Sequence, residues 1–185
     1  MFNLRLGAGL LAMALAINVT MTARPAVASS RAEINRDVDA ALAILYAKDP
    51  NARWLTSQAK AVLVFPGIVK AGFLFGAQYG EGALRARGKT VGYYNTVSAS
   101  YGLQAGVQTF GYALFFMTDS ALQYLAKSDG FELGVGPSIV VLDAGAAKAL
   151  TTTTAKEDMY AIFFDQRGLM AGLGLQGSKI SRIDK

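Results

Sequence analysis

Three cations lie within five residues of one another, at Arg85, Arg87 and Lys89 in the segment Arg-Ala-Arg-Gly-Lys. Guanidinium and ammonium groups bind phosphate oxygens through charge-assisted hydrogen bonds, so this cluster could hold the headgroup of an anionic phospholipid. If this segment is extended, the three side chains project to one side of it. A solvated turn would contain the same residues, and the sequence leaves both interpretations open.

Other side chains could complete such a site. Lys70 lies in the apolar segment before the cluster, and the two tyrosines that follow it are of a type found at membrane–water interfaces. Half-buried positions on a strand would explain these tyrosines equally well. The ligand-binding residues that we predict are Lys70, Arg85, Arg87, Lys89, Tyr93 and Tyr94.

Few residues in the sequence could catalyse a reaction or bind a metal. Histidine and cysteine are absent, which removes the commonest general base, the thiol nucleophile and the best transition-metal ligands. Glu81, between two glycines, is the most notable of the 13 acidic residues. We predict no catalytic residue, no metal, no cofactor and no enzymatic activity. A hydrolase with two converging carboxylates, or a site for a hard cation, is the less favoured alternative.

Two glycine patterns imitate known motifs. Residues 172–177 match G-x-G-x-x-G, but only eight residues follow, so the helix and acidic residue of a dinucleotide site are missing. Glycines at 72, 76 and 80 imitate the contact motif of membrane helices, although Lys70, Gln78 and Glu81 interrupt the segment. Both patterns favour strands whose glycines pack closely against a neighbour.

The N-terminus has the features of a secretory signal peptide. Arg5 precedes a mostly apolar run over residues 6–19, and Ala-Val-Ala at 26–28 forms a cleavage site before Ser29. A membrane anchor is the alternative, but the apolar run is short. The domains that we predict are a signal peptide (1–28), an N-terminal helical segment (29–56) and a β-rich domain (57–185). The protein would then be exported, periplasmic or secreted, and peripheral to a membrane.

The charge is mildly basic. The formal net charge is +5, and two of the cations, Arg5 and Arg24, belong to the predicted signal peptide. This balance permits an anionic lipid as a partner, and we expect no nucleic acid. Without cysteine, an exported domain must be stabilised by packing rather than by disulfides.

Local patterns predict the elements. Ser30 and Glu33 form a capping box before an amphipathic helix, and Asp49-Pro50 begins a second one. From Ala61 onward short apolar strands alternate with turns, which we place at 66–67, 85–89 and 165–168, and a short helix covers 121–126. The fold class is therefore α+β: a curled antiparallel β-sheet, barrel- or sandwich-like, with N-terminal amphipathic helices and one short internal helix.

The central stretch is AVLVFPGIVKAGFLFGAQYGEG, residues 61–82. Read as a strand, it puts its later glycines and Gln78 on one face and Ala71, Phe73, Phe75, Ala77 and Tyr79 on the other. This stretch resembles the signature of the SYLF domain family, and residues 100–108, 133–137 and 168–178 continue the resemblance in the same order.

The resemblance implies a function. SYLF domains bind phosphoinositides and, in fungal members, actin filaments, and an N-terminal amphipathic segment is implicated in lipid contact. We therefore expect an exported module that binds anionic phospholipid headgroups at a membrane surface. The alternative is a non-enzymatic structural or protein-interaction module of the cell envelope, actin-binding-like by this resemblance, that binds a protein partner or self-associates.

Overall fold

The protein is described by a computed structural model, which covers residues 29–72, 75–101, 106–127, 131–133, 135–142, 156–168 and 177–185. The predicted signal peptide (1–28), residues 172–176 of the glycine pattern and most of the last SYLF-like motif (168–178) lie outside these residues. Among the residues that the structure describes, no helix combines the length and apolar character needed to cross a bilayer.

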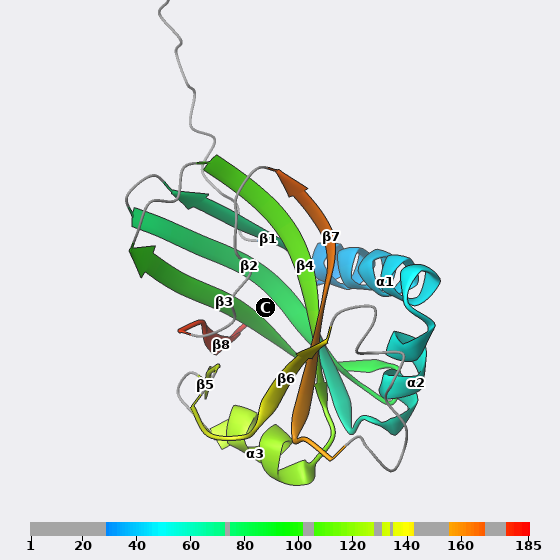
Figure 1. The fold of residues 1–185 in the computed structure, drawn as a ribbon. Helices are drawn as coiled ribbons and strands as arrows, with labels where there is room; N and C mark the ends of the chain where they lie inside the picture. The colour runs from blue at the N-terminus through cyan, green and yellow to red at the C-terminus, as the bar shows by residue number, and fades with distance from the viewer. Residues whose placement is uncertain are drawn as a thin grey trace, which may run out of the picture.

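In the part of the chain that the structure describes, eight strands form one curled sheet in the order β5-β8-β3-β2-β1-β4-β7-β6 (Figure 1). Their bounds are β1 Ala61–Gly72, β2 Phe75–Ala86, β3 Lys89–Tyr101, β4 Gly106–Phe116, β5 Phe131–Glu132, β6 Ile139–Leu142, β7 Met159–Gly168 and β8 Lys179–Ile183. The predicted α+β class with a curled sheet is confirmed, and the sheet forms a half-barrel. One detail was wrong: β6 and β7 are parallel, so the sheet is mixed. Residues 143–158 connect these two strands, and parallel neighbours require a long connection of this kind.

Within the described ranges, three helices accompany the sheet: α1 Arg31–Lys48, α2 Pro50–Gln58 and α3 Asp119–Lys127. The predicted capping box is present, because Ser30 Oγ accepts from the Glu33 N–H at 3.2 Å and Glu33 accepts from the Ser30 N–H at 2.7 Å. Asp49 caps α2, with Pro50 in its first turn. These local signals explain why the helices begin where the sequence indicates.

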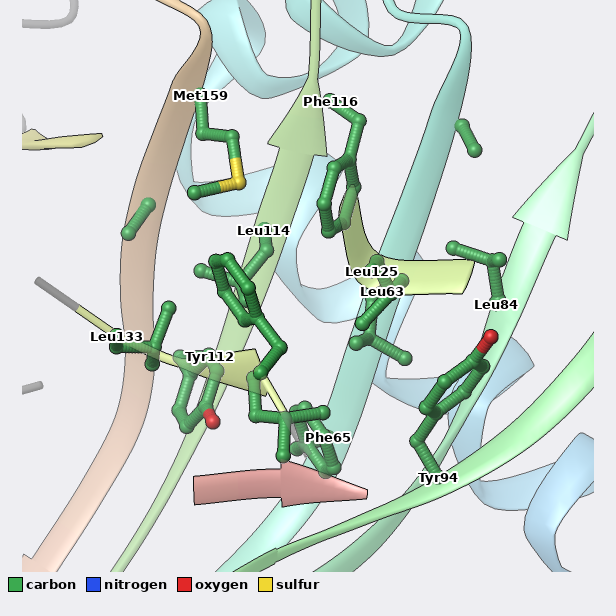
Figure 2. Packing of buried hydrophobic residues seen from close by; sticks show 14 of the residues in the cluster. Leu63, Phe65, Leu84, Tyr94, Tyr112, Leu114, Phe116, Leu125, Leu133 and Met159 are labelled. Atoms are coloured by element: carbon green, nitrogen blue, oxygen red, sulfur yellow. The ribbon is translucent and has the colours of Figure 1, made fainter. Parts of the chain in front are cut away.

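The sheet has two core-forming faces. The inner face, on the concave side of the half-barrel, holds an aromatic and aliphatic cluster that α3 closes (Figure 2). The outer face packs against α1 and α2 through Ile34, Val38, Leu45 and Leu55. As expected from the period of two, the glycine face of β2 turns inward, and Phe75 and Tyr79 point outward and are exposed.

Two predicted turns are strand irregularities instead. β1 continues through Pro66 and Gly67, where the register with both neighbouring strands shifts as at a β-bulge. A bulge tolerates the proline that a regular central strand would exclude. Residues 165–168 likewise belong to β7, and Asp165, at a φ of 50°, marks the register shift against β4.

Candidate functional site

A cavity of about 380 Å³ lies between α1, α2 and the hairpin that joins β2 to β3. We call it the basic pocket. Apolar side chains, including Leu42 and Val62, form part of its wall. Its polar lining includes Asp39, Tyr46, Thr56, Lys60, Arg85 and Arg87.

Arg85 is held at this pocket by α1. Its Nη2 donates to Asp39 Oδ1 at 2.6 Å and to the Asn35 carbonyl at 3.2 Å, and only 16% of its side chain is exposed. Within the described residues, Arg85 Nε is buried and has no hydrogen-bond partner. A buried donor without a partner is unfavourable by about 1–3 kcal/mol, so the two hydrogen bonds of Arg85 to α1 have to offset this loss.

Arg87 is exposed because it lies in a tight turn. Arg87 and Gly88 have φ values of 51° and 76°, and Ala86 pairs with Lys89 across them. Positive φ at both central residues is the geometry of a two-residue type I′ hairpin. The predicted basic turn is therefore present, and its Arg87 side chain borders the cavity.

The three cations of the turn do not project to one side, which corrects that expectation. A register shift follows Leu84, and the turn then reverses the chain. Arg85 faces α1 on the outer side, whereas Lys89 pairs with Ala86, which packs against the inner cluster. Lys89 instead lines an adjoining hollow with Lys60 and Arg87.

The two hollows are cationic. Their described lining contains four cations, Lys60, Arg85, Arg87 and Lys89, and two acids. Asp39 is paired with Arg85, and Asp119 lies 3.4 Å from Lys60 in an exposed ion pair that contributes little. The local excess of positive charge favours an anionic ligand.

Lys70 is not brought to this pocket. It lies in a row of residues paired across neighbouring strands, between Gln78 of β2 and Gln108 of β4. Gln78 precedes Arg85 by seven residues, which corresponds to about 23 Å along a strand. Gln78 Nε2 donates to Ser178 Oγ at 2.9 Å within the buried inner face. The row belongs to the interior of the half-barrel and is separate from the basic pocket.

The two predicted tyrosines have structural positions. Tyr93 is half-buried on the outer face and accepts a hydrogen bond from Asn35 Nδ2 at 2.9 Å. Tyr94 is 3% exposed and packs in the inner core (Figure 2), where burial raises the pKa of its hydroxyl. Tyr94 is therefore a core residue on a strand rather than an aromatic residue at a membrane interface.

Sequence reasoning missed the helical side of the pocket. Asp39, Leu42 and Tyr46 lie three and four residues apart on one flank of α1, a spacing that places them together. The Tyr46 hydroxyl is hydrogen-bonded to Thr56 Oγ1 of α2 at 2.8 Å. The sequence shows this spacing. It does not show against which face of the sheet this flank of α1 packs.

Glu81, which the sequence singled out, is bound within the chain. It accepts hydrogen bonds from Lys185 Nζ and from the Tyr79 hydroxyl. Burial opposes its ionisation, but these hydrogen bonds and the Lys185 charge outweigh burial and lower the pKa of Glu81. Across the residues that the structure describes, no three acids gather as ligands for a metal ion.

Comparison with known proteins gives one family. Residues 97–185 match the family model described as "Ysc84: Las17-binding protein actin regulator". No match was found among curated proteins. The matched segment begins within β3, so the residues that line the basic pocket precede it, whereas β4, β7 and β8 fall inside it.

Proposed function

Because this chain is a member of the SYLF domain family, whose model its residues 97–185 match, we propose that it is a non-enzymatic module that binds anionic lipid headgroups at a membrane surface. The observation that carries the proposal is the basic pocket. It brings Lys60, Arg85 and Arg87 together around one cavity.

The pocket suits a headgroup rather than a whole lipid. Its volume of about 380 Å³ lies at the small end of the range for ligand sites. A phosphate in the cavity would be attracted by the positive charges of Lys60, Arg85 and Arg87, which line it. Each cation near an anionic surface contributes about 1 kcal/mol. Because Asp39 already neutralises part of the Arg85 charge, the exposed cations supply much of the attraction.

The place of action that we propose is outside the cytoplasm, at the surface of a membrane. The support is the signal-peptide pattern that ends before Ser29. A phosphoinositide is the headgroup that the family resemblance suggests, and another anionic phospholipid would offer the same phosphate chemistry. Mass spectrometry of the N-terminus, before and after export, tests the cleavage.

Vesicle co-sedimentation tests lipid binding. The purified chain is mixed with neutral phosphatidylcholine vesicles, and with vesicles that contain phosphatidylglycerol or a phosphoinositide, at low and high salt. We expect binding to the anionic vesicles only, with an affinity that falls as salt is added, because screening weakens exposed charges. Equal binding to neutral vesicles, or binding that salt leaves unchanged, would contradict the proposal.

A second function is favoured by a different observation. The matched family model is described as an actin regulator that binds Las17, and this chain exposes apolar side chains on its sheet, Val69 and Val107 among them. An exposed apolar surface is typical of protein interaction. The alternative is therefore a structural or protein-interaction module, and its signature is protein binding that persists when the exposed cations of the pocket are removed.

A further inference from the structure

Ser29 lies against the ion pair between Lys185 and Glu81 of β2. Its carbonyl accepts a hydrogen bond from Lys185 Nζ at 2.9 Å, and the same Nζ lies 3.0 Å from both carboxylate oxygens of Glu81. Ser29 precedes the capping residue of α1, Ser30, so this contact lies at the start of the helix.

The backbone nitrogen of Ser29 is bonded to the same carboxylate. Burial raises the pKa of Glu81, but hydrogen bonds from Lys185, from Tyr79 and from the Ser29 backbone, with the Lys185 charge, lower it overall. A carboxylate only accepts hydrogen bonds, so the Ser29 N–H is the donor. The nitrogen that the proposed cleavage would turn into the α-amino group is therefore in hydrogen-bond contact with a mostly buried carboxylate.

Cleavage before Ser29 would change the chemistry of this nitrogen. In a peptide bond it is a neutral donor with one hydrogen. As the α-amino group of a first residue it is a cation with three hydrogens below its ordinary pKa of about 7.7–8.0. At the N-terminal end of α1 the helix dipole opposes a positive charge, so such a cation needs a carboxylate to offset the repulsion.

We propose that Glu81 binds the α-ammonium group that cleavage before Ser29 creates, and that this ion pair fastens the start of α1 to β2 in the mature protein. The inference rests on the export and cleavage that we propose above. Hydrogen bonds between ionised groups are about twice as strong as those between neutral groups. Cleavage thus strengthens a contact for which the fold already places both partners.

Both signs of charge surround this site. Lys185 shares Glu81 and limits the attraction, whereas the Glu33 carboxylate, which accepts from the Ser30 N–H at 2.7 Å, adds to it. Of the charged groups bonded to Ser29 or Ser30 within the described residues, two are carboxylates and one is an ammonium, so a second cation balances them. Lys185 also lines a hollow beside β3 and β8 with three further charged residues, Arg31, Arg182 and Asp184.

Titration of the α-amino group tests the ion pair. The ¹³C-labelled chain is purified after export, mass spectrometry reads its first residue, and the Ser29 carbon shifts are followed by NMR across the alkaline range. We expect the α-amino group to titrate above its ordinary pKa of about 7.7–8.0, and Glu81→Gln to lower the midpoint by about one unit, a tenfold loss of proton affinity. Asp37→Asn is the control, because its exposed carboxylate pairs with Arg36 and should leave the midpoint unchanged.

The outcomes separate this inference from the proposed function. A chain that begins at Ser29 but titrates at the ordinary value, or a midpoint that Glu81→Gln leaves unchanged, would overturn the ion pair and leave the cleavage standing. A first residue other than Ser29 would overturn both. Failure to bind vesicles would overturn only the lipid proposal, because Glu81 does not line the basic pocket.

Removal of the amino group tests its effect on stability. Periodate cleaves an N-terminal serine between the carbons that carry its amino and hydroxyl groups, so Ser29 loses its amine and the lysines keep theirs. At pH 7 the unfolding equilibrium constant of the parent chain should rise by about tenfold, and that of Glu81→Gln should change little. A group whose pKa is raised by folding stabilises the protein below its ordinary pKa and loses that effect as the pH rises through the folded-state pKa, so the difference should vanish in alkaline solution.

The parent chain alone keeps the inference testable if Glu81→Gln does not fold. Its titration midpoint and its response to periodate are both measured without the variant. A parent chain whose stability periodate leaves unchanged at neutral pH, or equal changes in the parent chain and in a folded Glu81→Gln variant, would overturn the inference.

Discussion

Lys185 Nζ lies 3.0 Å from both carboxylate oxygens of Glu81, and only 9% and 12% of the two side chains are exposed. The same ammonium group donates to the Ser29 carbonyl at 2.9 Å. One enclosed ion pair therefore joins three parts of the chain: the segment before α1, the middle of β2 and the segment after β8.

Glu81→Gln should destabilise the protein, most clearly in the neutral range. The hydrogen bonds hold the folded-state pKa of Glu81 below its ordinary value of 4.5. The stabilisation is thus complete above that value and is lost as the pH falls through the folded-state pKa. At neutral pH we expect the free energy of unfolding to fall by about 1–3 kcal/mol, as for a hydrogen-bonded charge left unpaired. Urea unfolding from pH 7 down to about pH 3 measures this.

The matched control is Asp37→Asn. Its carboxylate pairs with Arg36 at 3.0 Å, but both side chains are more than half exposed, so its stability effect should be small. The Glu81→Gln variant should also show a shallower loss of stability at acid pH than the parent chain. If the two variants behaved alike, the Lys185–Glu81 pair would have no special role in stability.

Gly82→Ala should destabilise the sheet strongly. A Cβ at this inward-facing position would clash with the Val64 carbonyl and the Phe65 ring, and neither can move freely in a packed core. We expect the free energy of unfolding to fall by about 1–3 kcal/mol or more. Gly67→Ala is the control, because nothing lies within 4 Å of its added methyl group. Comparable losses in thermal unfolding for the two variants would contradict this packing.

Short-range chemistry made much of this fold predictable. Ser30 with Glu33, Asp49 with Pro50, and the Arg-Ala-Arg-Gly-Lys turn all act within a few residues, so their geometry follows from the sequence. The alternation of glycine and aromatic residues in β2 likewise predicted two distinct faces. It did not reveal that the aromatic face is exposed, because that depends on how far α1 reaches along the strands.

Longer-range features were not predictable in this way. Pro66-Gly67 is typical of a turn, but pairing with β2 and β4 on both sides keeps β1 continuous through it. Arg85 and Lys89 were expected on one side, and a register shift separated them. The pocket itself requires α1 and α2 to pack beside the β2–β3 hairpin, a relationship between residues 46 positions apart in the Asp39–Arg85 pair.

Asp158→Ala should loosen the junction of β6, β7 and α3. Its carboxylate accepts from Thr118 Oγ1 at 2.9 Å and from the N–H and hydroxyl of Ser138 at 3.1 and 3.2 Å. The Ser138 N–H and the other hydrogen bonds lower the pKa of Asp158, so its contribution is present at neutral pH and lost in acid. We expect a loss of about 1–2 kcal/mol at pH 7.

Lys156→Ala is the control for Asp158→Ala, because it alters an exposed residue two positions earlier. Hydrogen exchange should show faster exchange of the β6–β7 amides in the aspartate variant and not in the lysine variant. Unchanged exchange in both would mean that the parallel pair is held by its backbone ladder and packing alone.

Removing the exposed cations of the pocket should weaken binding to anionic vesicles. The triple variant Lys60→Ala/Arg87→Ala/Lys89→Ala keeps Arg85 and its contacts with α1, so folding should be preserved. At about 1 kcal/mol for each cation near an anionic surface, the dissociation constant should rise by about 100-fold at low salt. The difference should shrink as added salt screens the exposed charges.

A variant with equal loss of charge elsewhere, Lys127→Ala/Lys156→Ala/Arg182→Ala, should lose much less affinity, because all three residues are exposed and line neither hollow. Equal losses in the two variants would mean that net charge, and not the pocket, governs the attraction.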